Sequence, residues 1–129
     1  MLGVSSAQEK IMSDNCLFCK IIAGSIPTDK VYEDEKVLGF KDINPLAALH
    51  VLFVHKEHSA NFSQMMDIDP EQALDVLKAI KKFVAEHQME EEGFRIVTNQ
   101  GHFGGQTVAH THFHLLGGSP LGPFGEQKK

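Results

Sequence analysis

Hydrophobic and polar positions alternate with a period of two in several short stretches of this chain. Two of them, Val31–Glu33 and Val37–Phe40, flank a polar turn and predict a hairpin. A third stretch, His50–His55, is mostly apolar, which is typical of a strand in the middle of a sheet. The stretches Phe94–Asn99 and Val108–Leu116 predict a fourth and a fifth strand.

Apolar positions recur at helical spacing in two other stretches. Leu17–Ile22 predicts a two-turn helix that is closed by Gly24. The segment Asp69–Gln72 supplies an N-cap, a proline at the first helical position and a capping-box partner. It begins a long amphipathic helix that Gly93 ends, and ordinary packing against the sheet explains its apolar stripe.

The order of these elements favours an α+β fold. Three strands form a meander before the long helix and two strands follow it, so we expect a five-stranded, mainly antiparallel sheet with the helices on one side. An open sheet has edges to protect, which favours a homodimer with a continuous sheet.

Composition narrows the class of protein. The 129 residues fit a single domain, which we expect at residues 14–129 after a flexible arm at residues 1–13. A net charge of -5 argues against a general nucleic-acid binder, because a phosphate backbone requires a basic surface, but a single nucleotide remains open as a ligand. Because no apolar run is long enough to span a membrane and no secretory signal is evident, we expect a cytoplasmic protein without a membrane partner.

Three histidines alternate with other residues near the end of the chain. In an extended segment, His110, His112 and His114 share one face, whereas Phe113 and Leu115 share the other. Successive imidazoles on that face lie about 7 Å apart, so two of them can contact one phosphate-sized ligand. Histidine can attack phosphorus and form a covalent intermediate, which splits one difficult displacement into two easier ones.

A glycine-rich loop and a cysteine pair complete the candidate chemistry. The loop Gly104–Thr107 can bring backbone N–H groups, an amide and a hydroxyl to a phosphate. Cys16 and Cys19 have C-x-x-C spacing, which in a reducing compartment indicates metal or redox chemistry more than a disulfide.

These motifs resemble those of a known family. His110–Leu116 matches the H-φ-H-φ-H-φ-φ signature of the histidine triad (HIT) superfamily, and Gly104–Thr107 looks like the loop that precedes it. The resemblance extends from about residue 15 to residue 123 through Phe18–Ile22, Ile26–Pro27, Val31–Asp34, Phe40–Ile43 and Asn99. The ending Leu115–Pro123 is similar to the Hint branch.

The resemblance implies a HIT-like fold and an adenosine 5'-monophosphoramidase-type hydrolase. Such an enzyme cleaves the P–N bond of purine nucleoside 5'-phosphoramidates, or acts on acyl or aminoacyl adenylates, and releases the nucleoside monophosphate through a nucleotidyl-histidine intermediate. It needs no organic cofactor.

The resemblance also implies roles for individual residues. His112 would be the nucleophile, His114 would contact the phosphoryl oxygens, and His50 would support them. Asp42 would bind the ribose hydroxyls. The nucleotide-binding set would comprise Leu17, Phe18, Ile21, Phe40, Asp42, Ile43, Asn99, Gly105, Gln106, Thr107, His112 and His114. Core packing explains its apolar members as well.

Some relatives hold a structural zinc ion with C-x-x-C and two histidines. The matching positions here are Cys16, Cys19, His58 and His110, a Cys2His2 set suited to tetrahedral Zn²⁺. The alternative is a pair of buried free thiols. Two rival functions also stay open: a dinucleoside polyphosphate hydrolase of the Fhit type, and a nucleotide-binding or scaffold protein with little turnover.

Overall fold

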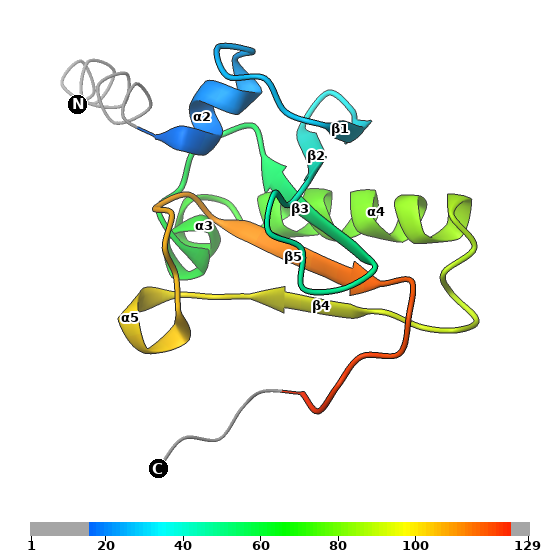
Figure 1. The fold of residues 1–129 in the computed structure, drawn as a ribbon. Helices are drawn as coiled ribbons and strands as arrows, with labels where there is room; N and C mark the ends of the chain where they lie inside the picture. Colours follow the sequence, from blue (N-terminus) through cyan, green and yellow to red (C-terminus); the bar gives the residue numbers. More distant parts are fainter. Residues whose placement is uncertain (1–15, 125–129) are drawn as a thin grey trace, which may run out of the picture.

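The computed structural model describes residues 16–124, so the expected arm at residues 1–13 lies outside it. Within the described residues, five strands form one antiparallel sheet in the order β1-β2-β3-β5-β4 (Figure 1). The strands are β1 Lys30–Glu33, β2 Val37–Lys41, β3 Leu49–His55, β4 Arg95–Thr98 and β5 His112–Gly117. The helices are α2 Leu17–Ile22, α3 Phe62–Ile68, α4 Glu71–Glu86 and α5 Gly101–Gly104. The predicted α+β class and antiparallel sheet are confirmed.

One face of the sheet packs against α4, which runs across the far side of the sheet in Figure 1. Val51 and Phe53 of β3 and Phe113 and Leu115 of β5 reach this face, because alternate residues of a strand point the same way. The ring of Phe53 meets that of Phe83 on α4 edge to face, with centroids 5.6 Å apart. This face carries the larger part of the core.

The opposite face carries α2. Leu38, Phe40, Leu52 and Val54, which alternate with the residues above, form a second core cluster with Phe18 of the short helix. The expectation that both predicted helices lie on one side was therefore wrong. A six-residue helix leaves much of this face uncovered, and the site described below lies there.

Strand β5 begins later than the sequence pattern predicted. The backbone N–H of His110 donates to the carbonyl of Val108 at 2.9 Å, and that of Thr111 donates to the carbonyl of Ser59 at 2.8 Å. These bonds take the chain out of the sheet ladder before His112. The three histidines therefore do not form one row: His112 and His114 lie on the strand, and His110 lies on the turn that leads into it.

The helices differ from the sequence prediction in three places. Asp69 does accept a hydrogen bond from a first-turn amide of α4, but Gln72 is buried and its Oε1 has no partner among the described residues, so it forms no capping box. Helix α4 ends at Glu86, well before Gly93. Two residues after this end, Gln88 adopts a left-handed φ of 57°. Helices α3 and α5 were not predicted.

No helix within residues 16–124 combines the length and hydropathy that a membrane-spanning segment requires.

Candidate functional site

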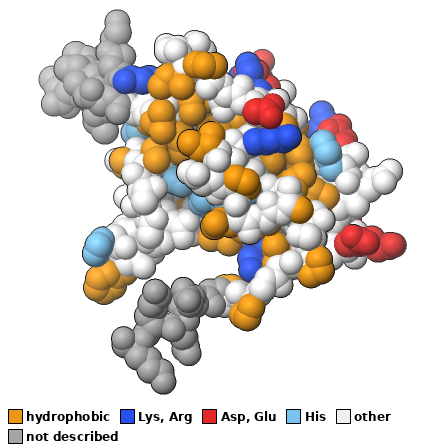
Figure 2. Space-filling view, in the orientation of Figure 1, with side chains coloured by type: hydrophobic (Ala, Val, Ile, Leu, Met, Phe, Trp, Pro, Cys, Tyr) orange, Lys and Arg blue, Asp and Glu red, His pale blue; other side chains and the backbone are white. Residues whose placement is uncertain are grey.

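A cavity of about 340 Å³ opens on the α2 side of the sheet. In Figure 2, histidine side chains reach the surface near the middle of the visible face, below hydrophobic side chains that lie over α2. The lining comprises Leu17, Phe18, Ile21, Ile26, Pro27, Thr28, Phe40, Lys41, Asp42, Ile43, Leu52, Thr107, Val108, His112 and His114. An apolar cleft with a few convergent polar groups is the usual form of a small-molecule site.

Most of the residues that the sequence assigned to a nucleotide meet in this cavity. The exceptions are Asn99, Gly105 and Gln106, which are not part of its lining. The Asn99 amide donates to the carbonyl of Gly104 at 2.6 Å. The Gln106 amide donates to the carbonyls of Ala60 and Val108, and its oxygen accepts from the Gly101 N–H. In this structure the side-chain amides of Asn99 and Gln106 therefore stabilise the conformation of the loop before Thr107.

The sequence reasoning missed several lining residues. Ile26, Pro27, Thr28, Lys41, Leu52 and Val108 complete the cavity. Leu52 had a readable signal, because it lies two positions after His50 on a strand and so shares its face. The segment Ile26–Thr28 follows α2 as irregular chain, and no periodicity points to it.

His112 has a ring orientation fixed by the backbone. Its Nδ1 lies 2.7 Å from the carbonyl oxygen of His110, and a carbonyl only accepts, so Nδ1 carries the proton. The neutral ring then keeps its lone pair on Nε2, which is the atom available to a ligand in the cavity. The ring of Phe18 packs against that of His112 with centroids 5.0 Å apart at 86°. Both contacts limit rotation of the imidazole.

His50 forms a hydrogen-bonded pair with His114, which lines the cavity. The backbone N–H of Leu46 donates to His50 Nδ1 at 3.1 Å, so a neutral His50 carries its proton on Nε2. That N–H donates to His114 Nδ1 at 2.8 Å, which leaves the second nitrogen of His114 as a donor. Asp42 Oδ2 lies 3.6 Å from His50 Nε2. We call Asp42, His50 and His114 the relay cluster.

Burial keeps the two histidines of the relay cluster neutral near pH 7. It lowers the pKa of His114 to about 4, with the neighbouring rings of His112 and His50 acting in the same direction and Asp42 opposing them. Burial also lowers the pKa of His50, and Asp42 again opposes the shift. His114 therefore acts as a neutral hydrogen-bond donor at this pH.

Four other side chains converge at the start of β5. Cys16 Sγ lies 3.3 Å from His110 Nδ1, Cys19 Sγ lies 3.2 Å from His58 Nδ1, and the two Nδ1 atoms are 3.1 Å apart. No disulfide joins the cysteines. We call Cys16, Cys19, His58 and His110 the Cys/His cluster; its four ligand atoms all lie within 4.8 Å of one another.

The chemistry of the Cys/His cluster fits zinc. A tetrahedral Zn²⁺ with sulfur and nitrogen ligands places neighbouring ligand atoms about 3.3 to 3.8 Å apart, close to the observed spacing. His110 Nε2 donates to the carbonyl of His55 at 3.1 Å, so the Nδ1 lone pair faces the two thiols. Burial lowers the pKa of His58, and lowers that of His110 to about 4, which keeps both rings unprotonated as ligands.

The relay cluster does not fit a metal, although its atoms are equally close. The Leu46 N–H occupies Nδ1 of His50, so the proton stays on Nε2, the atom that faces His114 and Asp42. A metal at Nε2 would have to displace that proton and leave an imidazolate. Hydrogen-bond transfer suits this cluster better than coordination.

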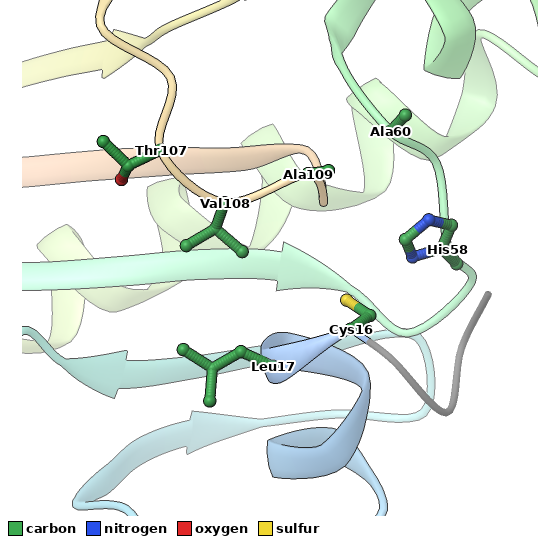
Figure 3. A pocket seen from close by; sticks show the side chains of 7 residues that line it. All are labelled: Cys16, Leu17, His58, Ala60, Thr107, Val108 and Ala109. Atoms are coloured by element: carbon green, nitrogen blue, oxygen red, sulfur yellow. The ribbon is translucent and has the colours of Figure 1, made fainter.

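A second cavity of about 520 Å³ lies beside the Cys/His cluster. Figure 3 shows Cys16 and His58 on one side of it and Thr107, Val108 and Leu17 on another. Leu17, Thr107 and Val108 also line the first cavity, so these three residues form a shared wall between the two.

Comparison with known proteins agrees with this geometry. The family profile of the HIT domain matches residues 23–121. The chain belongs to the HIT family. It is 39% identical over 113 residues to the purine nucleoside phosphoramidase of Escherichia coli K12, an alignment that covers 87% of this chain and 94% of that protein. It is 42% identical over 118 residues to an uncharacterised HIT-like protein of Methanocaldococcus jannaschii, covering 88% and 89% of the two chains.

Solved structures of HIT proteins share the fold. A histidine triad protein from Clostridium difficile aligns with a TM-score of 0.82 and 40% identity over 86% of this chain and 96% of that one. A HIT family hydrolase from Clostridium thermocellum aligns with a TM-score of 0.79 and 45% identity over 85% and 96%. The relatives of this HIT protein thus include hydrolases, which supports hydrolytic activity.

Proposed function

We propose that this HIT protein hydrolyses the P–N bond of purine nucleoside 5'-phosphoramidates, with His112 as the nucleophile. The observation that carries the proposal is the fixed tautomer of His112: the His110 carbonyl holds the proton on Nδ1 and leaves Nε2 with a lone pair in a cavity-lining ring. A nucleophile needs that lone pair at the reacting phosphorus. The likeness to a purine nucleoside phosphoramidase supports the choice of substrate.

The cavity supplies places for each part of such a nucleotide. Phe18, Ile21 and Phe40 form an apolar slot that suits a purine ring. Asp42 offers carboxylate oxygens to the ribose hydroxyls at the polar end of the same cavity. Thr107, which lines this cavity beside His112, would then offer its hydroxyl to the α-phosphate.

The reaction proceeds in two displacements. Nε2 of His112 bonds to the α-phosphorus while the P–N bond breaks, and the amine leaves after taking up a proton. Water then attacks the phosphorus of the nucleotidyl-histidine, frees His112 and gives up a proton as the nucleoside monophosphate departs. The remaining N–H of His114 is the donor that stabilises the phosphoryl oxygens in both transition states.

Zinc and a second copy of the chain belong to the same proposal. Zinc in the Cys/His cluster would join α2 to the start of β5 and so stabilise the cavity. A homodimer with a continuous sheet would pair β4, which lies at the sheet edge and exposes Phe94 and Ile96 nearby. Metal analysis and light scattering test these two points. The cytoplasmic location stays a prediction.

A turnover assay tests the function. Wild-type protein should release AMP from a fluorogenic adenosine 5'-phosphoramidate, and His112→Ala should lower kcat by about four or more orders of magnitude. The matched control is His87→Gln, a histidine at the end of α4 outside both cavities, which should keep wild-type kcat.

The rival functions give different results in the same assay. Faster turnover of a diadenosine polyphosphate than of the phosphoramidate would favour a dinucleoside polyphosphate hydrolase. AMP binding without turnover of either substrate by the wild type would favour a binding protein and overturn the proposal.

A further inference from the structure

His110 contacts both clusters at once, through different parts of the residue. Its Nδ1 faces Cys16 and Cys19 at 3.3 and 3.5 Å. Its backbone carbonyl accepts the Nδ1 proton of His112 at 2.7 Å. A change in the position of His110 therefore changes the hydrogen bond that selects the tautomer of His112.

Helix α2 provides a second connection. Cys16 is its N-cap, with Sγ accepting the Cys19 N–H at 3.3 Å, and Phe18 lies between the two cysteines. The Phe18 ring lies 5.0 Å from the ring of His112 and 5.5 Å from that of Phe40. An isolated helix of six residues is not stable in water, so α2 depends on its tertiary contacts. The cysteines that flank Phe18 supply two of those contacts.

The shared wall provides a third connection. Leu17 comes from α2, whereas Thr107 and Val108 come from the chain that leads to His110 (Figure 3). All three residues line both cavities. Movement at the Cys/His cluster therefore reaches the nucleotide cavity through side chains that belong to both sites.

We propose that zinc occupancy of the Cys/His cluster controls nucleotide binding and turnover, with His110 and Phe18 as positioning residues. Zinc holds the His110 ring and α2 together, which fixes the His112 tautomer and the wall of the purine slot. Without zinc, the buried side chains of Phe18 and Ile21 still hold α2 against the sheet, so the fold persists. The His112 ring then populates both tautomers, and the wall of the purine slot is no longer held in one position. The control of turnover rests on the proposed function, whereas the control of the His112 tautomer and of AMP binding does not.

Zinc titration with two readouts besides activity tests this proposal. The wild-type protein, stripped with a chelator and reloaded with zinc, is compared with Cys19→Ser, which removes a ligand of the Cys/His cluster that is not part of the lining of the first cavity. At about pH 8, where histidine is neutral, ¹⁵N shifts of His112 should report one Nδ1–H tautomer with zinc and a mixture of tautomers without it. The AMP dissociation constant should rise about tenfold on zinc removal, the size of outer-shell effects at metal sites. Cys19→Ser should show the zinc-free values at every zinc concentration.

Val84→Ala is the matched control for general loss of stability. Val84 is fully buried in the core cluster on the α4 face, away from α2. Its truncation should lower the melting temperature and leave the His112 tautomer and AMP affinity unchanged. The same changes in Val84→Ala as in zinc-free protein would overturn the proposal.

The remaining outcomes are also decisive. A folded zinc-free protein with a single His112 tautomer and unchanged AMP affinity overturns the proposal, and so does wild-type protein that binds no zinc. Global unfolding on zinc removal, seen by circular dichroism, assigns the ion a general structural role and overturns the local coupling. If the tautomer and AMP affinity respond to zinc but the wild type turns over no phosphoramidate, the proposed function fails and the coupling stands.

Discussion

The Cys/His cluster and the relay cluster each contain two histidines, one of which lies two positions from His112 in the sequence, yet the two clusters suit different chemistry. In the Cys/His cluster, the backbone carbonyl of His55 accepts a hydrogen bond from Nε2–H of His110, and the Nδ1 lone pair is left for a metal. In the second, a backbone N–H occupies Nδ1 of His50 and forces the proton onto Nε2. The main-chain partner of the second ring nitrogen, together with the thiols of the first cluster, decides between coordination and hydrogen-bond transfer.

The largest expected effect is on the free energy of unfolding, which should respond to zinc through the Cys/His cluster and not through the relay cluster. Zinc at about 1,000 times its dissociation constant should raise the free energy of unfolding of wild-type protein by about 4 kcal/mol, because only the folded chain brings the four ligands together. Cys16→Ser should lose this increment, and His50→Gln should keep it. Denaturant unfolding with and without zinc measures both. A loss in His50→Gln as well would mean that the clusters do not differ as described.

A smaller effect is expected from removing the backbone donor to His50. Leu46→Pro deletes the N–H and replaces a side chain that is exposed, and Leu46 is not among the described residues with a positive φ. With Nδ1 released, His50 should populate both tautomers and kcat should fall about tenfold. Leu46→Ala keeps the N–H and is the control. Equal kcat values for the two variants would show that this amide does not select the tautomer.

The smallest effect concerns the acid limb of the pH profile. His114, which faces His112, His50 and Asp42, has a pKa of about 4, below its ordinary value of 6.5. The folded state therefore binds fewer protons than the unfolded state between these values, and this group's contribution to stability falls as pH falls from 6.5 to 4. The loss of activity that is due to protonation of His114 should therefore appear only below pH 6 in the pH dependence of kcat/KM.

Asp42→Asn sharpens this test. The carboxylate favours the protonated rings of His50 and His114, so its removal should move the acid limb to lower pH while KM rises through loss of the ribose contact. The pH dependence of kcat/KM measures the shift. A limb that moves to higher pH in this variant would contradict the assignment.

Periodicity in the sequence predicted the strands and the faces of their residues. The alternation that places Phe113 and Leu115 in the core places His112 and His114 in the cavity. Helix α3 also had a readable signal. Asn61 accepts the Gln64 N–H at 2.9 Å as the N-cap, and an Asn-x-x-Gln spacing before apolar residues is a capping pattern.

Long-range hydrogen bonds produced the features that the sequence did not predict. The turn at His110 depends on the Ser59 carbonyl, and the Gln106 side chain depends on the Ala60 carbonyl, both far away in the chain. Local patterns carry no information about such partners. Cys16 and His110 are 94 positions apart, and only the family resemblance predicted that they belong to one site. The spacing of residues alone indicated only the two cysteines.

The shared wall has a practical consequence for chemical probes. A nucleoside analogue seated in the first cavity and extended past Val108 would carry its substituent towards the sulfur of Cys16. In the zinc-free protein, an electrophile on that extension would label Cys16 covalently and would spare HIT proteins without a thiol at that position. The two adjoining cavities thus offer a route to selective inhibitors that a purine slot alone does not.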